Sequence, residues 1–278
     1  MALKENETLI KSGNSVYHYW RELWLNRELF WIFAKRDVMV RYKQTVLGVA
    51  WSVIRPLLTT LVMVFAFGKI AKLEDSSSIP YMLIVLPGVM IWLFFSQSLQ
   101  QISFSIVGNA NLIAKVYFPR LLIPFSSLLV SLIDALIAFA LFVIFCFWYG
   151  FLPNWQIVFA PVFLILAYFG AFGAGLIAGI LNVKFRDIGQ IIPFAIQFGY
   201  FVSPVAYTSD RIKDQWWYFI YNLNPVAGAI DGLRWSMLGT TFSFNWESFI
   251  PLILFDIITV VIAIRLFRKA ENSFVDYL

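Results

Sequence analysis

Two carboxylates lie inside long apolar stretches of the chain, and they are the side chains best placed for chemistry there. Asp134 and Asp256 are each surrounded by apolar residues. A carboxylate within a bilayer costs about 2.5–3.5 kcal/mol on insertion scales, so each is a candidate for substrate contact or gating. Hydration near the outer end of its apolar stretch is the alternative for Asp256.

Other kinds of chemistry have little support in the sequence. His18 is the one histidine, and Cys146, the one cysteine, lies in an apolar run. We therefore expect no disulfide, no metal site and no catalytic nucleophile–base set. No G-x-x-x-x-G-K-[ST] motif is present, so we expect no catalytic residue, no cofactor site and no ATP-binding P-loop on this chain.

The composition predicts a multi-pass membrane protein. The chain has 278 residues, of which 60% are hydrophobic and 13% charged, with a mean hydropathy of +0.77. Soluble domains carry about 25% charged residues. We expect an all-α integral membrane fold with a cytoplasmic tail and interfacial helix over 1–48, a membrane domain over 49–278, and no cleaved signal peptide. The six predicted spans, each long enough to cross about 30 Å of hydrocarbon, cover 49–70, 81–106, 121–149, 155–181, 188–206 and 249–267.

The distribution of Lys and Arg predicts the orientation of these spans. If the N-terminus is cytoplasmic, five of the 21 cationic residues fall outside and the other 16 inside. Such an excess marks the cytoplasmic side, so both termini are predicted there. Arg55, near the cytoplasmic end of the first span, is expected to reach the headgroups. The five predicted external cations are Lys69, Lys72, Arg211, Lys213 and Arg234.

Two regions outside the spans have their own patterns. Residues 17–44 combine Trp, Leu and Arg at near-helical spacing, which predicts an amphipathic helix in the membrane interface; a soluble helix packed on a partner is the alternative. Residues 207–248 are too apolar for a loop and too broken to span twice. They predict two short external or re-entrant helices, 215–223 and 225–238, that face a pathway mouth.

Three further stretches stand out by their residue types. Residues 41–56, which lead into the first span, carry the strongest topological signal. The alternative is that they are the ordinary flanking anchor of a membrane helix. The loop 108–124 predicts a short helix and a rigid turn, with an ordinary connector as its alternative. Residues 182–207 predict a kinked wall of a gated passage or a bent packing helix, and Gly175-x-x-x-Gly179 predicts close helix packing. The named residues are Arg41, Tyr42, Lys43, Gly48, Trp51 and Pro56 in the first stretch; Asn111, Leu112, Lys115, Phe118, Pro119 and Arg120 in the second; and Lys184, Arg186 and Asp187 at the start of the third.

Aromatic residues crowd the predicted outer half of the membrane domain. They are typical of an aromatic belt at the headgroups, and they also suit apolar faces along which sugar rings slide. We take them, with neighbouring residues and the two carboxylates, as candidates for a translocation path. These candidates are Trp92, Tyr200, Phe201, Ser203, Pro204, Tyr207, Trp216, Trp217, Asp134 and Asp256.

Taken together, these stretches resemble the ABC-2 type permease subunit of polysaccharide ABC exporters. The resemblance rests on RYKQTVLGVAWSVIRP, NLIAKVYFPRLLIP, KFRDIGQIIPFAIQFGYFVSPVAY and NLNPVAGAIDGLRWSML, in that order. It covers nearly the whole chain. The sequence is most similar to O-antigen and teichoic-acid exporters, and less so to capsule exporters.

The resemblance implies a homodimer in a bacterial inner membrane, bound to two copies of a separate ATPase that holds ATP and Mg. The 108–120 loop would contact that ATPase, and the substrate would be a lipid-linked polysaccharide; no nucleic-acid partner is implied. A permease for small lipids or drugs is an alternative within the family. A membrane transferase for lipid-linked sugars is the alternative from another class.

Overall fold

The computed structural model describes residues 16–43, 48–73, 79–239, 242–271 and 274, and within them the chain is helical, with no strands. The longer helices are α3 (Ala50–Met63) with its π-helical continuation η1 (Val64–Ile70), α4 (Tyr81–Gly108), α6 (Leu122–Tyr149), α7 (Ala160–Lys184) after the 3₁₀ turn η2 (Trp155–Phe159), and α11 (Trp246–Ala270). The shorter helices are α1 (Val16–Leu25), α2 (Arg27–Lys43), α5 (Ala110–Lys115), α8 (Ile188–Val202), η3 (Ser209–Ile212), α9 (Tyr218–Asn222) and α10 (Pro225–Leu238).

Five helical segments among the described residues are long and apolar enough to cross a membrane. They match the first four predicted spans and the sixth. The predicted fifth span, 188–206, corresponds to α8, which has only 15 residues. At 1.5 Å per residue α8 is about 22 Å long, and the chain leaves the helix at Ser203. Six complete spans are therefore not confirmed by helix length.

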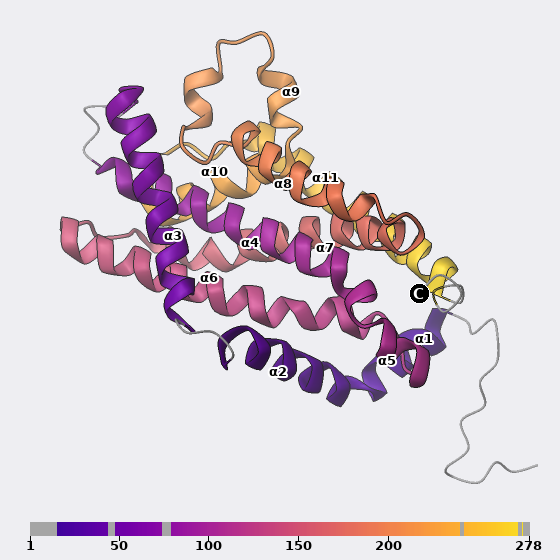
Figure 1. Ribbon diagram of the computed structural model, residues 1–278. Coiled ribbons are helices and arrows are strands. Elements are labelled where there is room, and N and C mark those ends of the chain that lie inside the picture. The colour runs from indigo at the N-terminus through magenta and orange to yellow at the C-terminus, as the bar shows by residue number, and fades with distance from the viewer. Residues whose placement is uncertain (1–15, 44–47, 74–78, 240–241, 272–273, 275–278) are drawn as a thin grey trace, which may run out of the picture.

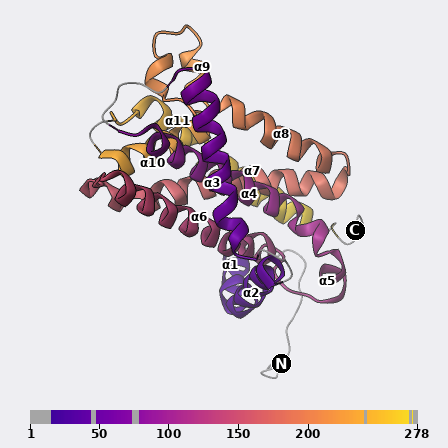
Figure 2. The ribbon, with the colours of Figure 1, turned by 60° about the vertical axis from the view of Figure 1, so that its left-hand side comes forward.

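Helix α4 is the centre of the bundle, and α7 lies between α4 and α11 (Figures 1 and 2). Small residues on α7 make this close packing possible. A Cβ on Gly173 would lie 2.5 Å from Thr259 Oγ1 on α11, and one on Gly175 would lie 3.0 Å from Ile102 on α4. The packing predicted from the glycine pattern is confirmed, because side chains at these positions would push the helices apart.

Helices α3 and α8 lie on either side of α4, and both leave several large apolar side chains exposed (Figures 1 and 2). Helix α3 contacts α4 and α6, and it begins just after Gly48, whose φ of +46° favours glycine. On α8, four apolar residues at helical spacing are each more than half exposed. They are Ile191, Phe194, Phe198 and Phe201.

The two ends of the bundle differ. At one end, α1, α5 and the last turn of α11 lie together, and the Arg268 guanidinium is 5.3 Å from the Tyr19 ring centroid (Figure 1). At the other end α9 protrudes, while α10 packs inside against α4, α7 and α11. The predicted interfacial helix is broken at Asn26 into α1 and α2, and α2 packs along α6.

Candidate functional site

The carboxylate of Asp134 joins four helices of the bundle. Its Oδ2 accepts hydrogen bonds from Arg41 Nη2 on α2 and Gln97 Nε2 on α4, both at 2.5 Å. Its Oδ1 accepts from Tyr42 Oη at 2.7 Å and from Ser52 Oγ on α3 at 2.5 Å. A carboxylate has lone pairs for all four donors. Asp134 therefore fixes α2, α3, α4 and α6 to one another.

Arg41 also lines three neighbouring cavities, which we call together the Arg41 groove. The first, of about 490 Å³, lies between α3, α4 and α6, and a second of about 470 Å³ runs beside α4. A third, of about 280 Å³, continues along α2 to Asn109 at the end of α4. The polar residues that line the groove include Arg41, Tyr42, Ser52, Arg55, Ser96, Gln97, Gln100, Gln101 and Asp134.

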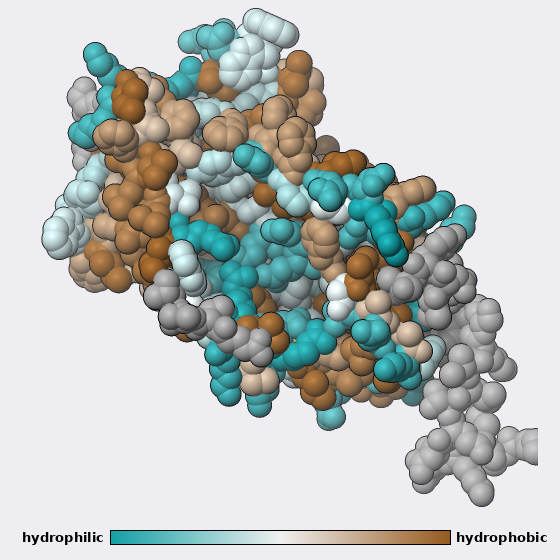
Figure 3. Space-filling model, in the orientation of Figure 1, coloured by the Kyte–Doolittle hydropathy of each residue, from teal (hydrophilic) through white to brown (hydrophobic). Residues whose placement is uncertain are grey.

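The groove gives the bundle a hydrophilic surface where an apolar one would be expected. Hydrophilic residues gather in the hollow between α2, α3 and α4, next to hydrophobic residues of α3 (Figure 3). From Asn109 to Leu93 the groove follows α4 for about 24 Å, since a helix rises 1.5 Å per residue. It therefore starts at the end that carries α1 and α5 and reaches far into the bundle.

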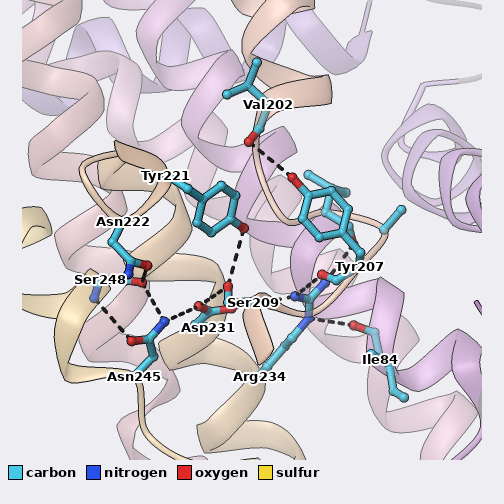
Figure 4. Close-up of polar contacts among 12 residues, drawn as sticks. Ile84, Val202, Tyr207, Ser209, Tyr221, Asn222, Asp231, Arg234, Asn245 and Ser248 are labelled. Atoms are coloured by element: carbon cyan, nitrogen blue, oxygen red, sulfur yellow. Dashed lines mark hydrogen bonds and ion pairs between the residues drawn. The ribbon is translucent and has the colours of Figure 1, made fainter. Parts of the chain in front are cut away.

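A second polar centre lies at the opposite end of the bundle, where Arg234 on α10 is 1% exposed (Figure 4). Its Nε donates to the Ile84 carbonyl at 2.9 Å. Its Nη1 and Nη2 donate to the carbonyls of Tyr207 and Val205, both at 2.8 Å. We call this arrangement the Arg234 clamp. It provides donors for a carbonyl of α4 and for two carbonyls of the non-helical segment after α8.

Asp231 supports this clamp from the preceding turn of α10. Its Oδ1 lies 3.8 Å from Arg234 Nη1, and its Oδ2 accepts from Ser209 Oγ at 2.5 Å and Asn245 Nδ2 at 3.1 Å (Figure 4). Burial raises the pKa of the Asp231 carboxyl, while the guanidinium and the two donors act in the opposite direction. The network connects α10 to the starts of η3 and α11, so it holds this end of the bundle together.

Comparison with known proteins identifies the family. Residues 28–238 match the model described as ABC-2 type transporter. The chain belongs to this family. It is 31% identical over 253 residues to the O-antigen export system permease protein RfbA of Klebsiella pneumoniae, which covers 90% of this chain and 95% of that protein. It is 28% identical to the protein of that name from Myxococcus xanthus, over 70% of this chain and 74% of the relative. It is 23% identical to the polysialic acid transport protein KpsM of Escherichia coli, over 86% and 92%.

In this ABC-2 permease the loop 108–120, which the resemblance predicts to be the coupling loop that contacts the ATPase, contains a short helix, as expected, but its residues differ in exposure. Helix α5 places Asn111 and Lys115 on the surface. Phe118 is 4% exposed and packs on Phe33 of α2, with ring centroids 5.4 Å apart. Phe118 therefore positions the loop from inside and is not presented to a partner. Leu112 and Arg120 are half-buried, and Pro119 is buried.

Arg120 connects this loop to the end of the chain. Its backbone N–H donates to Glu271 Oε1 at 3.0 Å, and its guanidinium donates to the Glu271 carbonyl. Burial raises the pKa of the Glu271 carboxyl. Because Glu271 directly follows α11, the loop after α5 is tied to the last turn of a predicted span.

The motif that leads into the first span is largely gathered at the groove. Arg41, Tyr42, Gly48, Trp51 and Pro56 all line its first cavity. Lys43 is exposed. The cluster at the start of α8 does not join this site: Lys184, Arg186 and Asp187 are exposed, and none of them lines the groove.

The predicted path residues are divided among different surroundings. Trp92 is 6% exposed and packs on Phe95 and Tyr200, so it is a core residue and not part of an open wall. Ser203 and Pro204 are buried, Tyr200, Tyr207 and Trp217 are half-buried, and Phe201 and Trp216 are exposed. Asp134 alone among these candidates lines the groove.

Sequence reasoning missed Gln97, Gln100, Gln101 and Ser52, and it treated Arg55 and Arg234 as peripheral. The structure adds to both: the exposed Arg55 also lines the groove, and Arg234, predicted among the external cations, has a buried side chain. Three glutamines within five residues of an otherwise apolar span were an available signal, because polar residues at that depth are costly. The described residues contain no group of three or more His, Cys, Asp or Glu that could hold a metal.

Asp256 has surroundings unlike those of Asp134. It is 5% exposed, neither carboxyl oxygen has a hydrogen-bond partner among the described residues, and a Cβ on Gly170 would lie 2.8 Å from its Oδ1. Its carboxylate therefore lies in the packed contact between α7 and α11.

We expect Asp256→Asn to fold as well as the parent chain or better, because it removes a potential charge with no donor nearby. The change in the free energy of unfolding should be about 1 kcal/mol or less. The measurement is the thermal midpoint in detergent. A drop as large as that of the Asp134 variant described below would show that Asp256 has an essential partner.

Proposed function

We propose that this chain is the permease subunit of an ABC exporter that moves a lipid-linked, O-antigen-like polysaccharide across the bacterial inner membrane from the cytoplasmic side. The observation that carries the proposal is the Arg41 groove, a polar surface that starts at the α5 end and reaches far into an apolar bundle. The relatives named for O-antigen export support the substrate class.

The groove has suitable chemistry for a sugar polymer. Amide and hydroxyl groups of Gln97, Gln100, Gln101 and Ser96 can donate to and accept from sugar hydroxyls. Such bonds are individually modest in net energy, about 1 kcal/mol each. A chain held by many exchangeable bonds can advance without a deep energy minimum at any one position.

The same proposal includes the assembly. Two copies of the chain, with both termini cytoplasmic, enclose the path, and two copies of an ATPase subunit bind ATP and Mg. The exposed apolar face of α8 and the exposed residues of α3, beside the groove, suit a contact with a second copy. In that assembly α8 and the segment 203–206 together form the predicted fifth span, which brings the number of crossings to six.

A second candidate substrate is a capsular polysaccharide or teichoic acid. Similarity to KpsM, named for polysialic acid transport, favours the capsule reading, although its identity to this chain is lower. Export assays with an O-antigen-like glycolipid, a capsular polysaccharide and a teichoic acid would distinguish the three candidate substrates. Transport of a small lipid or drug in place of any of them would contradict the polymer reading.

The exposed helix α5 allows a test of how ATP hydrolysis in the partner subunit is coupled to export. We expect Lys115→Glu to reduce ATP-driven glycolipid export in vesicles at least about tenfold, which corresponds to a loss of about 1.4 kcal/mol of contact energy. The reason is that Lys115 is exposed in the last turn of α5, where a charge reversal opposes docking of a complementary partner surface. Folding should be unaffected, because the side chain makes no core contact.

Lys269→Glu is the matched control, since Lys269 is also exposed and lies in the last turn of α11 at the same end of the bundle. It should export normally. Normal export by the Lys115 variant would remove α5 as the coupling helix. Glycolipid transport without any ATPase partner would contradict the proposed function itself.

A further inference from the structure

The first cavity of the Arg41 groove has two chemically different parts. One part presents guanidinium, amide and hydroxyl groups from Arg41, Arg55, Gln97 and Ser52. The other is lined by apolar side chains of α3, α4 and α6. These are Trp51, Ile54, Leu58, Met90, Leu93 and Phe94, with Ala135 and Ala138. A cavity of this kind fits an amphiphile, with its head at the polar part and its chain along the apolar part.

The charges of this cavity favour an anionic head. Its charged lining residues are Arg41, Arg55 and Asp134. Asp134 forms an ion pair with Arg41 at 2.5 Å. Among the described residues the Arg55 side chain has no ion pair or hydrogen bond, and Asp134 pairs with Arg41, so the exposed charge of Arg55 is not balanced within this cavity.

Arg55 is exposed and opens onto this cavity, so its charge is available to an anionic group there. Arg55 lies five residues into α3, about 8 Å from the start of a predicted span. Arginine within a span faces either a polar cavity or a counter-ion. A guanidinium recognises the oxygens of a phosphate through two parallel hydrogen bonds, which an ammonium cannot reproduce.

We propose that this cavity is a binding site for the phosphate-bearing head of a long-chain lipid with a net negative charge, with Arg55 as its anion-binding residue. Gln97 and Gln100 provide further donors beside it. The apolar lining of α3 and α4 takes up the first part of the lipid chain. The inference deepens the proposed function, on which it rests, by assigning the point where the lipid anchor of a substrate is held. The two sources of such a head are a membrane phospholipid and a polyprenyl diphosphate carrier.

The test measures lipid binding by the full-length chain in nanodiscs, without an ATPase and without transport. Nanodiscs are made of phosphatidylcholine alone, and the added probes are undecaprenyl diphosphate in one arm and phosphatidylglycerol in the other. We expect Arg55→Gln to weaken binding of at least one probe about tenfold or more, as for loss of a hydrogen-bonded charge. Arg55→Lys should recover only part of the affinity.

Arg265→Gln is the matched control. Arg265 is exposed and lies near the α5-side end of α11, at a depth similar to that of Arg55 but away from the groove. The arm that shows Arg55 dependence identifies the lipid source. Equal binding by the parent chain and Arg55→Gln in both arms, or an equal loss in Arg265→Gln, would overturn the site. Because no transport is measured, such a result would leave the proposed export function standing.

Discussion

Replacing Asp134 with Asn is expected to lower the free energy of unfolding by about 3 kcal/mol, within the range for removing one partner of a largely buried ion pair. The substitution leaves Arg41 without its counter-ion and turns an amide toward side chains that all donate. Because these donors come from α2, α3 and α4, the loss also loosens the walls of the groove. The measurements are the thermal midpoint in detergent and export in vesicles, which should fall together.

The matched control is Asp210→Asn, which breaks an exposed pair with Lys213 and should cost less than about 1 kcal/mol. A further variant separates charge from packing. Combining Asp134→Asn with Arg41→Gln removes both charges, and we expect it to be more stable than the sum of the single changes predicts, by about 1–3 kcal/mol. Strict additivity would show that the two side chains do not act as a pair.

The second large effect is expected at Arg234. Arg234→Met keeps the length of the side chain but leaves three backbone carbonyls without their donor and removes the cation beside Asp231. We expect a loss of about 3–5 kcal/mol, seen as a lower yield of folded protein and faster proteolysis within residues 203–209. Lysine should not restore stability, because one ammonium cannot match the geometry of three fixed N–H groups on a planar fork.

Arg211→Met provides the comparison for the Arg234 variants. Arg211 lies near the same end of the bundle, but it is exposed and donates to the Leu73 carbonyl at 2.9 Å. Its substitution should change stability by less than about 1 kcal/mol. If Arg234→Lys were as stable as the parent chain, the clamp would be a charge effect and not a set of directed hydrogen bonds.

Local sequence signals were sufficient for most helices. The third predicted span, 121–149, and α6 (Leu122–Tyr149) differ by one residue, because Pro119 and Gly150 punctuate a continuous apolar run. Asn224 caps α10 with a 3.0 Å bond to Val226 N, as the Asn-Pro pair predicts. The predicted fifth span, 188–206, extends past the end of α8 at Val202, because apolar residues continue there although the helix does not.

The predicted site was less accurate for a physical reason. Residue type indicates that a polar side chain inside a span is costly, but it does not indicate which partner offsets that cost. Arg41, Gln97 and Asp134 are 37 or more residues apart in pairs, and only packing brings them within hydrogen-bond distance. The same holds for Arg234 and Ile84, which are 150 residues apart.

The sequence by itself determined the class of the protein, its long helices, their predicted orientation and its family resemblance. These follow from local composition and spacing: apolar runs matched to the bilayer, cationic flanks, and short motifs in order. Only the tertiary structure decided that Arg55 faces a polar groove, that Arg234 is a buried clamp and that Phe118 points inward. Those outcomes depend on which helix faces pack against each other. The free energy of this packing depends jointly on side chains that are far apart along the chain.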